Sequence, residues 1–369
     1  MYTQNERNLI WLDSLNLLPK KRNSLMAILE ETDKESYILA FKAQRGKIAQ
    51  ILSDKELETA DKNASVEFLD NHIALHDNLG IEIITRISPS YPKLLLNILD
   101  APLVLYLKGN AGVLNNNCIA MVGTRRPTRY GREMCQFFAN KMCEAGLVLV
   151  SGLAFGIDTV VAQTAVDAKK PTIAVLAGGL DSIYPAQNYN LAEDIIKNGG
   201  AIISEYPIKI RPQAYSFLER NRIISGLSLG TIVVEAGERS GALTTAADSI
   251  EQNRELFVLP GNINSYASMG CNNLIRKLPD CFTISPDDVF NRLHINTKNE
   301  VAKQTTQQLT MEENLILCSL NGEEKNLDDI VEETNISSKD AISLISSLEI
   351  KGIIKRLPGN YFAKISLPN

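Results

Sequence analysis

The sequence predicts an α/β protein in which a doubly wound, mostly parallel sheet is flanked by an N-terminal helical unit and a C-terminal winged helix. Three observations predict this fold. Six short apolar runs alternate with helical stretches in the middle of the chain. The residues before them have leucines at helical spacing and almost no glycine, and the residues after them show three helices and a hairpin. A chain of 369 residues has room for two or three domains.

The first predicted unit covers residues 1–80. Leu9, Leu12 and Leu15 repeat at helical spacing, and further apolar residues repeat in the same way downstream. This period is typical of amphipathic helices, so we expect a small helical domain. His72 and His76 stand four residues apart on one of these helices, but no third ligand stands near them, so no metal site is predicted.

The middle unit, residues 81–292, contains the strand candidates. They are CIAMVG (118–123), LVLVSG (147–152), TIAVLAGG (172–179), AIISEY (201–206), TIVVEAG (231–237) and LFVLPG (256–261). The helical stretches between them are 132–145, 159–168, 189–198, 218–227 and 243–252. Continuous rather than alternating apolar residues indicate strands that are covered on both faces. Alternating strands and helices of this kind form a parallel sheet with right-handed crossovers.

Five of the six runs end in glycine, at Gly123, Gly152, Gly179, Gly237 and Gly261. Ligands of doubly wound sheets bind at the carboxyl ends of the strands. Glycine lets the chain turn tightly there and lets a ligand approach the backbone. We therefore expect these five glycines to border one cleft.

Arginines gather in the loops at this predicted edge. MVGTRRPTRYG (121–131) carries Arg125, Arg126 and Arg129, and later loops add Arg220, Asn221, Arg222 and Arg239. The planar guanidinium suits phosphate oxygens, so these loops predict a phosphate-binding crevice. Pairing of the arginines with Glu205, Glu219, Glu235 and Glu238 in the same loops is the open alternative.

Two helix starts strengthen the prediction of an anion site. SGLAFGID (151–158) places Gly152 and Gly156 before a helix that Asp158 can cap, and Ser240 or Thr244 can cap the helix after Arg239. Free backbone amides and the helix dipole at such starts attract anions. Phe217 can stack on a base, which favours single-stranded nucleic acid, although a buried core phenylalanine is the equally open alternative.

The composition and the absence of several motifs reduce the number of function classes that this protein can belong to. The net charge of −5 allows only a local basic patch. No GxxxxGK[ST] or GxGxxG motif is present, which disfavours the usual P-loop and dinucleotide sites. No histidine occurs from 101 to 292, so a Ser-His-Asp or Cys-His site is excluded there. Six cysteines without CxxC spacing, no signal peptide and no long apolar run predict buried thiols in a cytoplasmic protein.

The C-terminal region is predicted to be a polar linker, residues 293–309, followed by a winged helix, residues 310–369. The hairpin turn is expected at Pro358-Gly359-Asn360. Residues 310–369 contain ten acidic and six basic side chains, a net charge of −4. This balance favours contact with a protein, or weak contact with DNA, over sequence-specific DNA reading.

The ordered motifs resemble the DprA (Smf) family of bacterial DNA-processing proteins. The resemblance runs from about Tyr91 to Leu278, through VGTRRPTRYG, SGLAFGID, SEYP, FLERNRIISGLS, VVEAGERSGALTTA and VLPGNINSYASMGCNNLI. It implies an extended Rossmann domain that binds single-stranded DNA, dimerises, and loads RecA onto incoming strands during natural transformation while displacing single-strand-binding protein. It implies no enzymatic activity, no cofactor and no metal. The helical unit would correspond to the family's sterile-alpha-motif-like domain.

By motif position, the resemblance implies Arg125 as the main phosphate-binding arginine and Phe217 as the base-stacking residue. Ala214 stands where some members carry a DNA-contacting lysine, and the nearby Arg211 can replace it. The complete predicted DNA-binding set is Gly123, Thr124, Arg125, Arg126, Gly152, Gly156, Arg211, Phe217, Arg220, Asn221, Arg222, Arg239, Ser240, Gly241 and Thr244.

An enzymatic alternative comes from a second resemblance. The LOG family of nucleotide phosphoribohydrolases shares the Rossmann variant and carries PGGxGTxxE after the equivalent strand. This chain has AGERSGALTTA there, and Glu235 or Asp158 would have to act as the acid or base.

Overall fold

The computed structural model describes residues 2–32, 34–295, 310–320, 324–350, 353–357 and 359–364. The chain divides into two units, residues 1–295 and 296–369. The predicted linker lies outside the described residues from position 296 to 309.

The first unit begins with six helices, as the leucine spacing predicts. They are α1 (Gln4–Ser14), α2 (Pro19–Glu30), α3 (Tyr37–Ala43), α4 (Arg45–Ile48), α5 (Asp54–Asn63) and α6 (Val66–Asp77). Capping boxes start α1 and α5, where Thr3 and Ser53 pair with a glutamate three residues later. Trp11 and Phe41 are fully buried between the helices in an edge-to-face contact, with ring centroids 5.6 Å apart.

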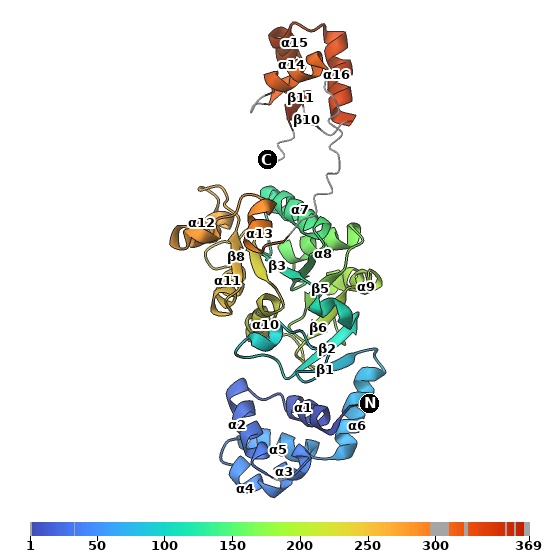
Figure 1. The fold of residues 1–369 in the computed structure, drawn as a ribbon, viewed down its shortest axis with the longest axis vertical. Coiled ribbons are helices and arrows are strands. Elements are labelled where there is room, and N and C mark those ends of the chain that lie inside the picture. Colours follow the sequence, from blue (N-terminus) through green and yellow to red (C-terminus); the bar gives the residue numbers. More distant parts are fainter. Residues whose placement is uncertain are drawn as a thin grey trace. The chain divides into compact units, whose positions relative to one another are not determined.

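An eight-stranded sheet forms the centre of this unit, in the order β1-β2-β6-β5-β4-β3-β7-β8 (Figure 1). The strands are β1 (Glu82–Thr85), β2 (Val104–Gly109), β3 (Cys118–Val122), β4 (Val148–Ser151), β5 (Thr172–Val175), β6 (Ala201–Ser204), β7 (Gly230–Val233) and β8 (Glu255–Val258). The six predicted runs are the six parallel strands β3 to β8. β1 and β2 extend the sheet at one edge as antiparallel strands.

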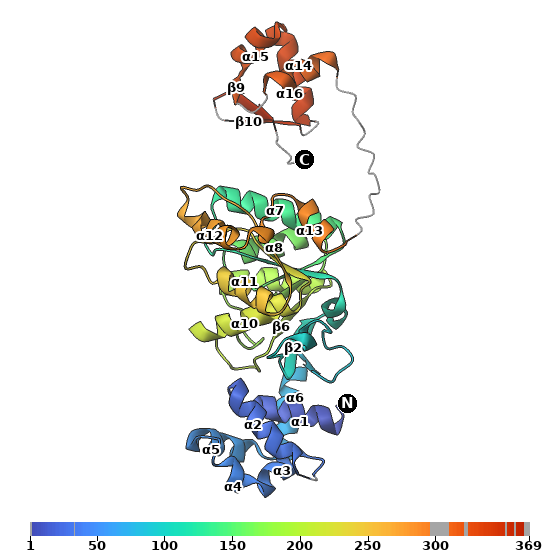
Figure 2. The ribbon, with the colours of Figure 1, turned by 60° about the vertical axis from the view of Figure 1, so that its left-hand side comes forward.

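Helices cover both faces of the sheet, which explains why its strands are apolar throughout. One face is covered by α7 (Arg129–Glu144), α8 (Ile157–Asp167), α9 (Tyr189–Lys197) and α13 (Pro286–Arg292). The other face is covered by α10 (Ala214–Gly226), α11 (Ala242–Glu251) and α12 (Met269–Lys277) (Figure 1 and Figure 2). In β3, Ile119 and Met121 join the first face, and Ala120 and Val122 join the second. The predicted doubly wound architecture is confirmed.

Two details differ from the sequence prediction. β3 and β4 stop one residue before the predicted ends, whereas β5 and β7 stop four residues before them. In β5 the predicted run is too long because Ala177 is apolar and buried but lies in the loop after the strand. α10 begins at Ala214, not at Leu218, because Gln213 and Ser216 form a capping box that starts the helix earlier.

The helices α1 and α6 pack against the antiparallel edge of the sheet through polar contacts as well as apolar ones. The buried hydroxyl of Tyr106 on β2 donates to Asp13 Oδ2 on α1 at 2.9 Å. His76 Nδ1 lies 2.8 Å from the carbonyl of His72, and Ile208 N donates to His76 Nε2 at 3.2 Å. Both ring nitrogens of His76 are therefore engaged within the protein, which accounts for this histidine without a metal.

Burial raises the pKa of Asp13 to about 7, against an ordinary value of 3.8, although Tyr106 and Arg22 act to lower it. A raised pKa in the folded state means that stability is full below about pH 4 and is lost as the pH rises to about 7. We expect Asp13→Asn to gain stability over the parent protein between about pH 5 and about pH 8, by about 1.4 kcal/mol per pH unit until Asp13 is ionised. Denaturant unfolding of both proteins across this range measures the difference. A difference that does not change with pH would contradict the assignment.

The second unit has the predicted winged-helix pattern. It consists of α14 (Met311–Ser319), β9 (Lys325–Asn326), α15 (Leu327–Thr334), α16 (Ser338–Ile350), β10 (Ile354–Leu357) and β11 (Tyr361–Lys364). β10 and β11 form the expected hairpin, and the short β9, which the sequence pattern did not indicate, pairs with β11. Ile316, Ile330, Leu348 and Phe362 lie in its core. Pro358 of the predicted turn lies outside the described residues.

Two further expectations concern cysteines and membrane spans. Five cysteines are buried and free, as expected, whereas Cys318 is exposed. Among the described residues no helix is both long enough and apolar enough to cross a bilayer.

Candidate nucleic-acid interface

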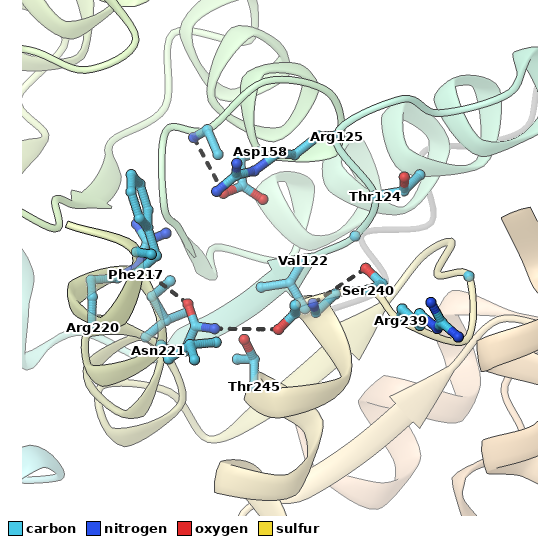
Figure 3. A pocket seen from close by; sticks show the side chains of 18 of the residues that line it. Val122, Thr124, Arg125, Asp158, Phe217, Arg220, Asn221, Arg239, Ser240 and Thr245 are labelled. Carbon is cyan, nitrogen blue, oxygen red and sulfur yellow. Dashed lines mark hydrogen bonds between the residues drawn. The ribbon is translucent and has the colours of Figure 1, made fainter. Parts of the chain in front are cut away.

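A large cavity lies at the carboxyl edge of the sheet, where the sequence predicts a phosphate-binding crevice (Figure 3). Its volume is about 870 Å³. The predicted residues that line it are Gly123, Thr124, Arg125, Phe217, Arg220, Asn221, Arg239, Ser240 and Gly241. They come from the loop after β3, from α10 and from the loop before α11. We call this cavity the edge pocket.

The loop after β3 holds Arg125 at the mouth of the edge pocket. Thr124 N donates to the carbonyl of Glu235 at 2.7 Å, and Ile157 N donates to the carbonyl of Thr124 at 3.1 Å. Gly156 has φ +82°, and a Cβ there would lie 2.3 Å from the Thr124 carbonyl oxygen. The loop can pack this closely only because position 156 is glycine. The backbone is thereby fixed while the Arg125 side chain stays exposed.

The aromatic side chain of Phe217 lies next to Arg125, and that of Tyr184 lies next to Phe217. The Arg125 guanidinium carbon lies 5.1 Å from the centroid of the Phe217 ring, a cation–π distance. Phe217 is half-buried, so it is not the enclosed core residue that was the alternative. The Tyr184 ring lies 5.9 Å from the Phe217 ring, and Tyr184 is 54% exposed. Sequence analysis missed Tyr184; its only signal was an aromatic residue in the long loop after β5.

Arg220 is part of the floor of the edge pocket. It is 4% exposed and donates to the carbonyls of Gly152, at 2.7 Å, and of Val175. Burial lowers the pKa of Arg220 to about 10, so the guanidinium is charged at neutral pH. A Cβ at Gly152 would lie 2.1 Å from Arg220 Nη1, so glycine is needed where this side chain crosses the β4 loop. Arg220 thus braces two strand ends in addition to facing the cavity.

Asp158 is the buried carboxylate beside Arg220. It accepts hydrogen bonds from Gly152 N at 3.2 Å and Ala154 N at 3.3 Å. Burial raises the pKa of Asp158, and the charge of Arg220 opposes this rise. The expectation that Asp158 caps α8 is wrong: the N-cap is Gly156, and the Asp158 carboxylate turns back to the β4 loop.

The start of α11 also differs from the prediction. The N-cap is Gly241, without a side-chain cap, and Ser240 Oγ accepts from Ala242 N at 3.3 Å. The amides of Leu243 and Thr244 donate to carbonyls of the same turn, so fewer amides are free than expected. Asn221 Nδ2 donates to Gly241 O at 3.3 Å and Thr244 Oγ1 at 3.2 Å, which ties α10 to this loop. Arg239 remains exposed at the rim.

The remaining predicted residues are distributed more widely. Gly152 and Gly156 pack against residues of the lining, and the exposed Thr244 accepts a hydrogen bond from Asn221 of the lining. Arg126 and Arg211 are exposed and lie outside the lining. Arg222 faces a different cavity, where it forms an ion pair of 2.6 Å with Glu205. For Arg222 the alternative prediction, pairing with a carboxylate in place of phosphate binding, is therefore confirmed. For the other predicted residues, contact with DNA stays a prediction.

The five strand-end glycines do not share one cleft. Gly123 and Gly237 line the edge pocket, and Gly152 lies behind it. Gly179 instead packs against the backbone of Pro207 and Ile208, and Gly261 borders a separate cavity. The prediction is wrong for these two because long loops follow β5 and β8 and bend their glycines away. One of these loops supplies Tyr266, which lies over Gly237 and lines the edge pocket at 65% exposure.

Comparison with known proteins agrees with this geometry. Residues 82–294 match the sequence model of DNA recombination-mediator protein A, and residues 300–360 match that of the DprA winged helix domain. Protein Smf of Escherichia coli is 30% identical over 95% of this chain and 94% of its own length. DNA processing protein DprA of Bacillus subtilis is 39% identical over 66% of this chain and 82% of its own length.

Solved structures support the same assignment. DprA from Streptococcus pneumoniae superimposes with a TM-score of 0.65 at 30% identity, covering 78% of this chain and 97% of that one. DNA processing protein A from Helicobacter pylori, described for its single-stranded DNA binding mode, gives a TM-score of 0.52 at 32% identity, covering 58% and 95%. With the fold, the ordered motifs and the full-length relatives in agreement, the chain belongs to the DprA (Smf) family of DNA-processing proteins.

Proposed function

We propose that this protein binds single-stranded DNA at the edge pocket without catalysing a reaction. The observation that carries the proposal is the position of Arg125 at 5.1 Å from the Phe217 ring, at the mouth of the cavity. A guanidinium beside a partly exposed aromatic ring can hold a phosphate and stack its base at the same point. The family relationship and the DNA-binding structure of the Helicobacter pylori relative support this proposal.

A titration of labelled single- and double-stranded oligonucleotides at two salt concentrations tests the function. We expect single strands to bind more tightly than duplexes, because a stacked base in a duplex is not accessible to Phe217. The affinity should fall as salt rises, because phosphate contacts release counterions. Failure to bind oligo-dT even at low salt would refute the proposal.

Phe217→Ala is expected to weaken single-strand binding by about 1–3 kcal/mol, the contribution of one stacked base. The slope of log affinity against log salt should stay as in the parent protein, because no charge is removed. Phe217→Tyr is the matched control, since it keeps a ring of similar size, and it should retain binding. Equal affinities of Phe217→Ala and the parent in fluorescence anisotropy would show that no base stacks there.

The wider role that we propose is that of a recombination mediator in natural transformation. The protein would act as a cytoplasmic homodimer that protects incoming single strands and loads RecA onto them against single-strand-binding protein. The family's description as a DNA recombination-mediator protein supports this role. RecA ATPase activity on strands precoated with single-strand-binding protein should rise on addition of this protein, and light scattering should report a dimer.

The positions of the two candidate acid–base carboxylates favour binding over nucleotide hydrolysis. Glu235 is 2% exposed, and its oxygens accept from Thr128 N at 2.8 Å and Thr128 Oγ1 at 2.7 Å. The Asp158 carboxylate accepts hydrogen bonds from the backbone amides of Gly152 and Ala154. Both carboxylates are thus engaged in holding loops, and release of free base from a nucleoside monophosphate is not expected.

A further inference from the structure

A second cavity, of about 480 Å³, is bordered by three loops that also border the edge pocket. The loop after β3 contributes Arg125 to the edge pocket and Thr128 to the second cavity. The loops after β7 and β8 likewise contribute residues to both cavities. Tyr130, Glu235, Asn262 and Ser265 are among the residues that line the second cavity. We call it the β8 cavity.

The two cavities follow one another along the carboxyl edge of the sheet. Tyr184 of the edge pocket comes from the loop after β5, and Asn262 of the β8 cavity comes from the loop after β8. The parallel strands between these loops have the order β5-β4-β3-β7-β8. At about 4.8 Å between neighbouring strands, the two cavities together extend over roughly 20 Å of the edge. This is the length of about six nucleotides at the spacing of about 3.4 Å in a stacked strand. One DNA strand of moderate length can therefore reach both cavities.

Tyr266 lies at the boundary between the two cavities. It lines the edge pocket, and its neighbour Ser265 lines the β8 cavity. Its ring lies against Gly237, where an added Cβ would come within 3.4 Å of Tyr266 Cε1. Because Tyr266 is also largely exposed, a base that lies just outside the edge pocket can stack on this ring.

The β8 cavity has an accessible ring of its own. Tyr130, in the first turn of α7, lines the cavity and is 41% exposed. Its hydroxyl donates to the carbonyl of Pro260 at 2.7 Å, which holds the ring between α7 and the loop after β8. A side chain that is already held in place loses little conformational entropy when a base stacks on it.

The charges of the β8 cavity favour a base over a phosphate. Glu235 is the one charged side chain among the described residues that line it, and a carboxylate repels a phosphate. Asn262 and Ser265 offer an amide and a hydroxyl to the edge of a base. The volume of about 480 Å³ is in the range of cavities that bind small organic groups. A base that belongs to a strand suits this cavity, because its phosphates can stay with Arg125 and Arg239 in the edge pocket.

We propose that one DNA strand occupies both cavities, continuing from the edge pocket over Tyr266 and placing a further base against Tyr130 in the β8 cavity. This inference rests on the proposed function, since the edge pocket anchors the strand. It predicts that affinity increases with strand length until the strand spans both cavities.

Strand length distinguishes the two cavities in an experiment. Anisotropy titrations of the full chain at low salt compare oligo-dT of about 3 and about 12 nucleotides, because at about 3.4 Å per nucleotide only the longer one spans both cavities. We expect Tyr130→Ala to bind the long strand roughly 5- to 100-fold more weakly than the parent does, the usual effect of losing one stacked base. Its affinity for the short strand should equal that of the parent.

Two further variants are the controls. Tyr130→Phe keeps the ring and should bind the long strand like the parent. Tyr189→Ala removes an exposed tyrosine of α9 that lines neither cavity, and it should bind both strands like the parent. Equal affinities of Tyr130→Ala and the parent for the long strand would overturn the proposal, and so would an equal loss for both lengths. If the parent binds neither strand, the proposed function itself is refuted.

Cross-linking of the parent protein gives a result that does not depend on the folding of Tyr130→Ala. Two long oligo-dT strands carry 5-iododeoxyuridine near the 5′ end or near the 3′ end, and irradiation links this base to an aromatic side chain that stacks on it. We expect one of the two strands to form an adduct with Tyr130, which also gives the direction of the strand. Adducts with Phe217 or Tyr184 but none with Tyr130 would overturn the proposal while leaving the proposed function intact.

Discussion

Arg125→Ala is expected to weaken single-strand binding roughly 10- to 100-fold, whatever the base sequence. A hydrogen bond between a charged arginine and a phosphate contributes about 1.5–3 kcal/mol, and each 1.4 kcal/mol is about tenfold in affinity. The slope of log affinity against log salt should also become shallower by about 0.7, the value for one phosphate contact on a single strand. Anisotropy titrations of labelled oligo-dT and of a mixed sequence, at about 50 mM and about 200 mM salt, measure both quantities.

Arg129→Ala is the matched control for this variant. Arg129 belongs to the same arginine-rich stretch, but it starts α7, pairs with Glu133 at 2.7 Å and lies outside the lining of the edge pocket. Its loss should leave affinity and salt slope close to those of the parent. If the two variants weaken binding equally, the effect comes from general positive charge, and the role that we assign to the edge pocket is wrong.

Together with Phe217→Ala, Arg125→Ala separates two kinds of contact at one point. The arginine variant should change both affinity and salt slope, and the phenylalanine variant should change affinity alone. Because the two side chains touch, their effects are not expected to add independently. A double variant that is less impaired than the product of the single effects would show that Arg125 also holds the Phe217 ring in position.

The sequence predicts the parallel core of this fold well, because consecutive residues of these strands are apolar and buried. Cys118–Val122 is buried at every position and reads as a strand without any tertiary information. β1 and β2 lack a crossover helix between them, so their antiparallel pairing at the sheet edge does not follow from the alternation of strands and helices. Thr85 pairs with Val104 there, and the neighbouring Tyr106 of β2 donates to Asp13 of α1, a contact between distant parts of the chain that no local pattern indicates.

The sequence predicts the residues of the edge pocket that directly follow strands. It does not predict those that come from long loops. Thr124 and Arg125 follow β3 within three residues, so their position is set by the strand. Arg220 and Arg222 are two residues apart on α10, so their side chains point to different sides of the helix. Arg220 lines the edge pocket, whereas Arg222 lines the cavity that also contains Glu205. The packing of α10 determines which arginine faces the edge pocket, and the sequence pattern does not show this packing. Tyr184 reaches the edge pocket through a loop whose course no local pattern indicates.

Replacement of Arg220 by methionine is expected to destabilise the first unit by about 3–5 kcal/mol, the usual effect of leaving a buried charge uncompensated, because the charge of Arg220 offsets that of the buried Asp158. The variant removes the donor to Gly152 O and Val175 O and leaves Asp158 buried without its cation. Loss of that cation should raise the pKa of Asp158 further. Because a raised pKa in the folded state removes stability as the pH increases, the deficit should be larger at about pH 8 than at about pH 5.

The double variant Arg220→Met with Asp158→Asn decides whether this pair carries the effect. Removing the Asp158 charge should restore part of the lost stability and abolish most of the added pH dependence. Asp158→Asn alone should destabilise the protein less than Arg220→Met alone. Thermal unfolding at the two pH values measures these differences. Strictly additive losses would show that the carbonyl contacts of Arg220, and not its electrostatic attraction to Asp158, hold the β4 and β5 loops together. In either case oligonucleotide affinity should be compared below the unfolding transition, because Arg220 both braces these loops and faces the cavity in which Arg125 and Phe217 meet.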